Sequence, residues 1–145
     1  MLRQLLLGAA VSACNIVIHA LVMAAVVRVV HRATLVSTTR PWRHLSVVMI
    51  ATVMVLMAAH LSEILVWSGC YAIVGATPPG ADRVYFAFGN YTTLGYGDIT
   101  PVQGWRLLGP LTAMNGVMLF GWSTAVIFEV LRRTMRRVDL VDGPK

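Results

Sequence analysis

Three long apolar stretches dominate the chain, and short polar segments separate them. They run over about Leu5–Val27, Leu45–Trp67 and Leu107–Leu131. The hydrocarbon core of a bilayer is about 30 Å thick, and a helix needs about 20 apolar residues to cross it. The pattern therefore predicts an all-α membrane protein with three transmembrane helices.

A shorter element is predicted between the second and third stretches. Residues 82–91 have a helical pattern, and Asp82 is a suitable N-cap because its carboxylate can accept hydrogen bonds from the first backbone N–H groups. Pro78, Pro79 and Gly80 precede it and end the second span. A helix of this length cannot cross a bilayer. We expect it to be re-entrant, since non-helical backbone at membrane depth must be buried in protein or line water.

The composition agrees with this pattern and excludes several classes of protein. Of 145 residues, 57% are hydrophobic and only 12% are charged, far from the balance of a soluble domain. The net charge of +6 does not indicate nucleic-acid binding, because the cations gather near helix ends. No paired carboxylates, nucleophile with a base, or phosphate-binding glycine loop is visible, so we expect neither an enzyme nor a cofactor. Cys14 and Cys70 allow at most one disulfide. Cys70, in the outer loop, is either a free thiol, which is favoured, or part of an interchain disulfide in an oxidising compartment.

Basic residues are distributed unevenly and predict the orientation. They concentrate between the first two spans and after the third, at Arg28, Arg32, Arg40, Arg43, Arg132, Arg133, Arg136, Arg137 and Lys145. The positive-inside rule places these segments in the cytoplasm. We therefore expect a multi-pass protein of the cell membrane with an extracellular or periplasmic N-terminus and a cytoplasmic C-terminus.

The first span carries two features that need interpretation. Arg3, a leucine-rich stretch and Cys14 resemble a lipoprotein signal peptide, but the apolar sequence continues to Val30, which favours an uncleaved helix. Asn15 and His19 lie one helical turn apart. Polar residues in a membrane helix usually hydrogen-bond to another helix, and a functional histidine is the alternative.

The second span contains His60 and Glu63 near its outer end, three residues apart and so on one helix face. An intramembrane carboxylate is a functional hypothesis by default. Three interpretations stay open: Glu63 snorkels to the interface, it forms a hydrogen-bonded buttress against the short helix, or the pair binds a metal. A metal site needs three or four ligands, and no partner motif is visible in the sequence.

The most informative stretch is Thr92-Thr93-Leu94-Gly95-Tyr96-Gly97-Asp98, between the short helix and the third span. Glycine permits positive φ, and such angles can turn successive carbonyl groups toward one axis. The seven residues match without gaps the selectivity-filter signature of pore-loop potassium channels, and the chain resembles that family. Looser similarity runs over about residues 85–129, including the glycine-bearing middle of the third span.

The resemblance implies a potassium-selective channel that conducts passively as a homotetramer, with one filter strand per chain. It places K⁺ against oxygens of Thr93, Leu94, Gly95 and Tyr96, with Gly97 and Asp98 at the outer mouth. Thr92 supports the filter. The third span becomes the pore-lining helix, with Val117, Phe120, Thr124 and Phe128 toward the axis. Gly116 and Gly121 then serve either close packing or a gating hinge. The resulting division is residues 1–44 as an additional helix and basic linker, 45–137 as a pore module, and 138–145 as a short tail.

The chain departs from the family pattern at several positions. Leu94 replaces the commoner valine or isoleucine, and Gly89 stands where some channels place a glutamate against the filter aspartate. Asp98 then needs another partner, for which Glu63, Tyr85 or a water molecule is a candidate. These changes concern the rigidity of the filter.

Two rival functions and one partner remain open. A weakly selective cation channel is the first rival, and a non-conducting membrane subunit or small membrane enzyme is the second, for which His60 and Glu63 are the best argument. The arginines after the third span, Arg132, Arg133, Arg136 and Arg137, either bind anionic lipid headgroups or only anchor the topology.

Overall fold

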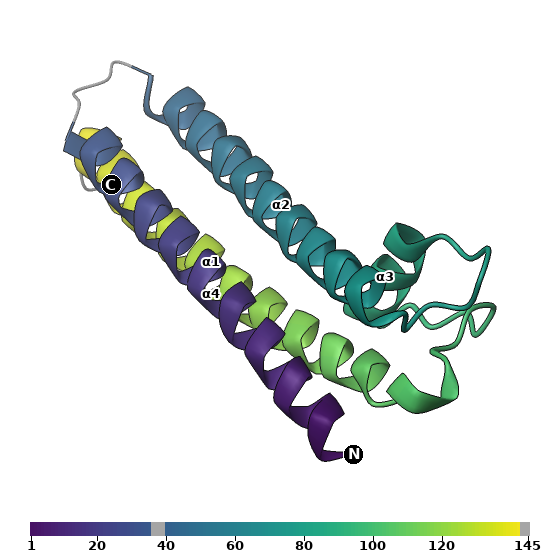
Figure 1. Cartoon of the computed structure of the whole chain (residues 1–145). Helices are drawn as coiled ribbons and strands as arrows, with labels where there is room; N and C mark the ends of the chain where they lie inside the picture. Colours follow the sequence, from purple (N-terminus) through teal and green to yellow (C-terminus); the bar gives the residue numbers. More distant parts are fainter. Residues whose placement is uncertain (36–39, 143–145) are drawn as a thin grey trace.

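The computed structural model describes residues 1–35 and 40–142 and consists of helices (Figure 1). The elements are α1 (Leu2–Leu35), α2 (Pro41–Val74), α3 (Arg83–Tyr91), a 3-10 turn η1 (Gln103–Trp105) and α4 (Leu108–Asp142). Lys145 and the middle of the predicted basic linker lie outside the described residues, as does the side chain of Arg137.

Three helices are long and apolar enough to cross a membrane, which confirms the predicted spans. The candidate spans are Leu2–Ala33, Pro41–Val74 and Gln103–Arg136. Helices α1 and α2 extend beyond their predicted apolar stretches at both ends, and α4 extends beyond its predicted stretch at the C-terminal end. Helix α1 is continuous through Cys14 and packs along α2 and α4.

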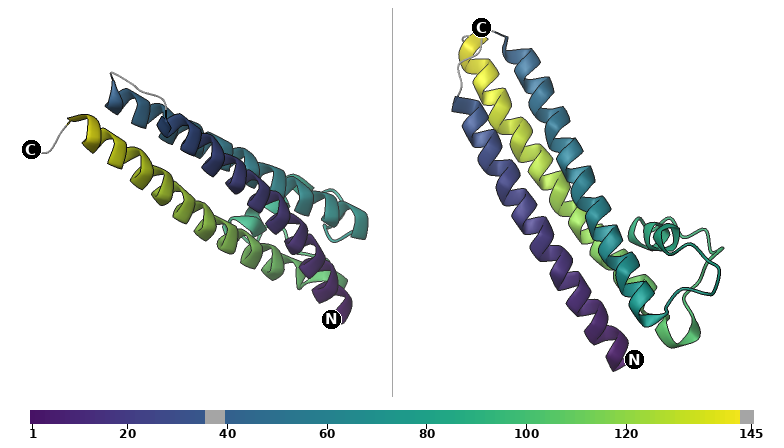
Figure 2. Two further views of the ribbon diagram at one scale, coloured as in Figure 1. Left: turned by 90° about the vertical axis from the view of Figure 1, so that its left-hand side faces the viewer. Right: turned by 45° about the horizontal axis from the view of Figure 1, so that its top comes forward.

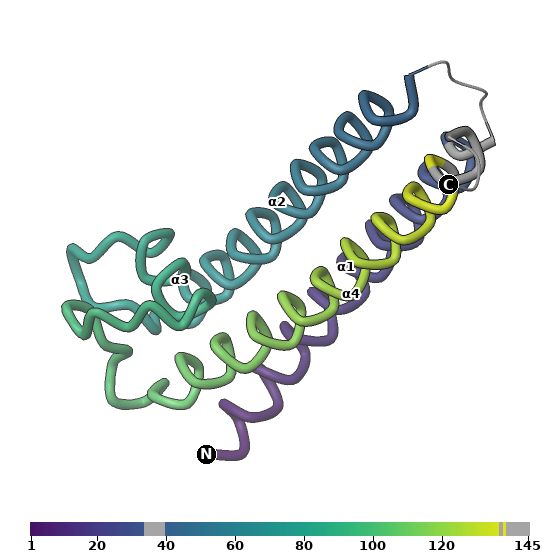
Figure 3. Tube along the Cα trace, turned by 180° about the vertical axis from the view of Figure 1, so that it is seen from behind, coloured from purple at the N-terminus to yellow at the C-terminus, as the bar shows by residue number. Residues whose placement is uncertain are grey.

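The three long helices form one bundle, with α3 and its loops gathered at one end (Figures 1 and 2). Helices α1 and α4 run in the same direction and α2 runs against both. The N-terminus lies at the end that carries α3, and the C-terminus lies at the other end (Figure 3). Three crossings therefore separate the two termini along the bundle, as the predicted topology requires.

Local sequence signals explain where the helices begin and end. Pro41 occupies the first turn of α2, where its missing N–H costs nothing. Gly75 ends α2 in the left-handed conformation, with φ of 65°, and its N–H donates to the carbonyl of Tyr71. The predicted cap of α3 is confirmed: the Asp82 carboxylate accepts hydrogen bonds from the backbone N–H groups of Val84 and Tyr85, at 2.8 and 3.2 Å.

Two apolar clusters hold the bundle together. At the α3 end, large aromatic side chains are fully buried, including Trp67, Tyr71 and Tyr91. Toward the opposite end, smaller side chains such as Val26 and Val130 pack between α1, α2 and α4. The side chains of Tyr71 and Thr112 hydrogen-bond at 2.5 Å and connect α2 with α4.

Two glycines allow close packing between helices. A Cβ on Gly8 would clash with the side chain of Leu111, so this residue lets α1 approach α4. A Cβ on Gly116 would clash with the backbone carbonyl oxygen of Tyr91. Small residues at such contacts are typical of helix packing in membranes. Of the two roles predicted for Gly116, the structure favours close packing, because the last residue of α3 rests on it.

We expect Gly116→Ala to destabilise the protein, because the added methyl group would meet backbone rather than a movable side chain. Overpacking of this kind costs about 1–3 kcal/mol. Gly121→Ala is the matched control on the same helix, since nothing lies within 4 Å of its Cβ position. Thermal unfolding in detergent should show a lower Tm for Gly116→Ala and an unchanged or higher Tm for Gly121→Ala. Equal Tm values for the two variants would contradict the close contact.

Candidate functional site

Residues Thr92–Asp98, called here the 92–98 segment, leave the C-terminal end of α3 and turn back beside it. The N–H of Thr92 donates to the carbonyl of Phe88 at 2.9 Å, and the N–H of Leu94 donates to the carbonyl of Gly89 at 3.0 Å. The side chain of Thr92 also donates to the Phe88 carbonyl, at 2.8 Å. The start of the segment is therefore fixed to α3, and all of its residues are exposed in the single chain.

The backbone of the segment alternates in handedness. Thr93, Gly95 and Gly97 have positive φ values of 59°, 56° and 79°, whereas Leu94 and Tyr96 between them do not. In a regular β-strand successive residues point to opposite faces. Alternating left-handed and right-handed residues instead turns consecutive carbonyls toward one side. A row of carbonyl oxygens on one side can replace the hydration shell of a cation.

The positive φ of Gly95 confirms the sequence-based prediction, but that of Thr93 was not expected. A β-branched residue with positive φ is rare and costs about 1–3 kcal/mol. The residue type at position 93 does not predict this angle, because threonine favours extended backbone. The sequence offers one indirect indication: Thr93 lies two residues before Gly95, and positive φ recurs at every second residue of the segment. Such strain is typical of functional segments.

Tyr85 and Asp98 lie together at the outer end of the segment. The Asp98 carboxylate raises the pKa of the Tyr85 phenol above its usual value, chiefly through a hydrogen bond with it and also through its charge. Both side chains are exposed, so solvent weakens the interaction. The structure thus brings together Asp98 and one of its three suggested partners. Glu63 instead faces other groups.

The residues predicted to line a pore share one exposed face of α4. Val117, Phe120, Thr124 and Phe128 are exposed in the single chain, whereas Asn115 on the same helix is buried against α1 and α2. Gly121 lies on the exposed face and touches nothing within 4 Å of its Cβ position. The ring of Phe120 also contacts the inside of the bundle, with its centroid 4.4 Å from that of His60.

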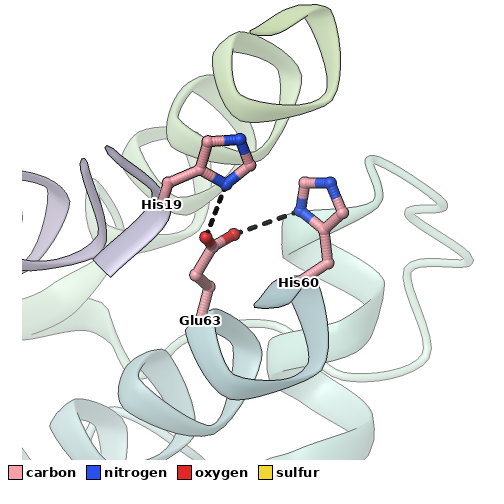
Figure 4. A group of neighbouring side chains, drawn as sticks. All are labelled: His19, His60 and Glu63. Atoms are coloured by element: carbon pink, nitrogen blue, oxygen red, sulfur yellow. Dashed lines mark hydrogen bonds and ion pairs between the residues drawn. The ribbon is translucent and has the colours of Figure 1, made fainter. Parts of the chain in front are cut away.

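Inside the bundle, the carboxylate of Glu63 lies within hydrogen-bonding distance of side chains from three helices. His19 on α1 places Nδ1 2.8 Å from Glu63 Oε1, and His60 on α2 places Nδ1 3.1 Å from Glu63 Oε2 (Figure 4). The hydroxyl of Tyr91, the last residue of α3, donates to the same Oε2. Glu63 is 0% exposed. Snorkelling to the interface is therefore wrong, because the carboxylate points into the bundle toward these groups.

A second layer of polar side chains extends the network to α4. Ser123 Oγ lies 2.9 Å from His60 Nε2 and 3.4 Å from His19 Nε2. Asn115 Oδ1 accepts hydrogen bonds from the Asn15 amide and the Trp67 indole, both at 3.0 Å. The interhelical role predicted for Asn15 and His19 is confirmed. The sequence showed no link between His19 and Glu63, because 44 residues separate them.

Comparisons with known proteins connect this geometry to one family. Neither the curated proteins nor the solved structures contain a match to the chain. The family model described as "Ion channel" matches residues 59–133, just over half of the chain. This range holds the second half of α2, all of α3, the 92–98 segment and most of α4, and it excludes α1. The chain, a membrane protein with three apolar spans, therefore belongs to the ion channel family.

Proposed function

We propose that the protein is a potassium-selective channel in which the 92–98 segment is one quarter of the selectivity filter. The observation that carries the proposal is the alternation of positive φ at Thr93, Gly95 and Gly97 within a seven-residue filter signature. Rings of backbone carbonyls select K⁺ by replacing its water shell. Thr93, Leu94, Gly95 and Tyr96 supply these oxygens, and Gly97 and Asp98 shape the outer mouth.

A homotetramer completes the filter. One chain supplies one row of oxygens, and closed fourfold symmetry repeats the same heterologous interface around the axis. The exposure of the whole 92–98 segment in the single chain supports this assembly, as does the exposed face of α4 with Val117, Phe120, Thr124 and Phe128. In the tetramer these four residues line the cavity below the filter.

Helix α3 acts as the re-entrant pore helix. Its C-terminal carbonyls carry a partial negative charge that favours a cation in the cavity. Tyr91, at that end, makes two contacts that fix its position. Its hydroxyl donates a hydrogen bond to Glu63, and its backbone carbonyl packs against Gly116. Thr92 and the Tyr85–Asp98 contact support the filter itself, and Glu63 supports it through Tyr91.

The basic end of α4 faces the cytoplasm in this arrangement. Arg132 and Arg133 pair with Glu129 at 2.7 and 2.5 Å. Arg136, one turn further along α4, is exposed. Each basic residue near an anionic membrane surface contributes about 1 kcal/mol of attraction. Because Glu129 neutralises part of the positive charge, we expect this end of α4 to bind anionic lipid headgroups less strongly than four unpaired arginines would.

The filter predicts a severe effect of Gly95→Ala. At this position an added Cβ meets only the Thr93 carbonyl oxygen, at 3.8 Å, so the cost comes from the φ of 56°. A left-handed residue other than glycine costs about 1–2 kcal/mol, and four chains share the filter. In liposomes loaded with K⁺, the variant should lose potassium efflux or its preference over sodium. Leu94→Val, which keeps the carbonyl, should be mild.

Gly104→Ala is the matched control, because Gly104 lies outside the filter and has nothing within 4 Å of its Cβ position. It should conduct as the unmodified protein does. Potassium efflux from Gly95→Ala with unchanged selectivity would mean that the 92–98 segment is not the filter. Absence of any ion flux in the unmodified protein would favour the non-conducting subunit.

The assembly is tested by the mass of the complex. We expect native mass spectrometry of the protein released from mild detergent to show tetramers, since each chain carries a single filter strand. Only monomers or dimers across several detergents would contradict the fourfold pore.

The topology is tested by reporters fused to each end. We expect the N-terminus on the outer side and the C-terminus in the cytoplasm, because the arginine-rich segments favour the cytoplasm and the termini lie at opposite ends of the bundle. The reversed pair of locations, or both ends on one side, would refute this orientation.

A further inference from the structure

The cluster of His19, His60 and Glu63 has the composition of a metal site. One ligand atom from each of these three buried residues lies within 4.8 Å of the other two. Two imidazoles and a carboxylate suit Zn²⁺ and similar divalent transition metals. Helix bundles place such sites in their cores, with ligands from facing helices. Figure 4 shows both histidines turned toward the carboxylate from different helices.

The three candidate ligands lie close enough together to converge on one ion. With metal–ligand bonds of about 2.0–2.1 Å, neighbouring ligand atoms in a tetrahedron lie about 3.3 Å apart. His19 Nδ1 lies 2.8 Å from Glu63 Oε1 and His60 Nδ1 lies 3.1 Å from Glu63 Oε2, and one ligand atom from each residue lies within 4.8 Å of the other two. A rearrangement of these side chains that brings the three ligand atoms around one point would admit the ion. Tyr91 places its hydroxyl 3.0 Å from His60 Nδ1 and beside the carboxylate, where it can fill the fourth position.

The charge of the cluster also calls for a cation. Glu63 is fully buried, and its polar side-chain partners among the described residues are the two histidines and Tyr91. An ionised carboxylate in a membrane interior is costly unless a positive charge accompanies it. Neutral histidines do not supply that charge. A divalent ion supplies two positive charges, and Tyr91 bound as a phenolate, with its proton released to solvent, would balance the second.

Proton counting around Ser123 leads to the same conclusion. In a metal-free cluster with neutral imidazoles, both Nδ1 atoms must carry hydrogen to bond the carboxylate. Both Nε2 atoms are then acceptors beside one serine hydroxyl, which has one proton to give. With a metal on both Nδ1 atoms, each Nε2–H donates to a lone pair of Ser123 Oγ. This is the usual second hydrogen bond of a metal-ligating histidine.

The geometry points to a site for a divalent transition-metal ion of the zinc type, held by His19, His60 and Glu63, with Tyr91 in the fourth position. The ion would bind side chains from α1, α2 and α3. Its ligand from α3, Tyr91, directly precedes the 92–98 segment. Access is at His60, whose side chain is 11% exposed beside Phe120, whereas those of His19 and Glu63 are 0% exposed. This inference goes beyond the proposed channel function, and its test does not depend on conduction.

The test uses the purified full chain, stripped with a chelator and titrated with Co²⁺. We expect one Co²⁺ per chain with the visible absorption of a four-coordinate ion, displacement by Zn²⁺, and a Tm that rises with Zn²⁺ concentration. His19→Gln and His60→Gln should remove these signals, while glutamine keeps hydrogen-bonding capacity. Ser123→Ala should weaken binding by about 10- to 100-fold, the usual effect of losing such a supporting contact.

His44→Gln is the matched control, since it removes a histidine of α2 whose Nε2 has no hydrogen-bond partner among the described residues. It should bind Co²⁺ as the unmodified protein does. Four-coordinate binding that persists in His19→Gln would place the metal elsewhere and overturn the proposal. If a histidine variant fails to fold, the titration of the unmodified protein still decides. If the unmodified protein binds no stoichiometric Co²⁺, the metal site does not exist. The positive charge beside Glu63 then comes from an extra proton on one of the two imidazoles.

Discussion

A carboxylate without access to solvent lies where α1, α2 and α3 meet, and its hydrogen bonds determine how these helices are arranged. Burying an acidic side chain inside a membrane protein is costly unless it is paired or hydrogen-bonded. Contacts of Glu63 with His19, His60 and Tyr91 offset part of this cost. Because each contact comes from a different position in the chain, satisfying one group fixes the relative placement of three helices.

The consequences reach the 92–98 segment through Tyr91. This residue ends α3, donates to Glu63 through its hydroxyl and rests its carbonyl on Gly116 of α4. The backbone N–H groups of Thr92, Thr93 and Leu94 donate to carbonyls in the last turn of α3, and from Thr93 onward the sign of φ alternates. A strained backbone of this kind persists only where its surroundings hold it. The buried polar network, the glycine contact and the α3 cap form those surroundings in the single chain.

Features that depend on neighbouring residues were predictable from the sequence, whereas contacts between distant residues were not. The three spans follow from the length of the apolar stretches, and the α3 cap follows from Asp82. The positive φ of Gly95 was expected from the filter signature, because glycine permits this angle and the resemblance implies inward-facing carbonyls. By contrast, the carboxylate partner of His19 and the carbonyl that rests on Gly116 depend on how helices pack. The angle of Thr93 opposes its own propensity, so only the surrounding structure can impose it.

The central claim is that the 92–98 segment selects potassium, and the reversal potential tests it most directly. The purified protein would be placed in a planar bilayer with potassium on one side and sodium on the other at equal concentration. We expect a reversal potential displaced far from zero in the direction set by potassium permeability. A reversal potential near zero, with current clearly carried by the protein, would contradict potassium selectivity.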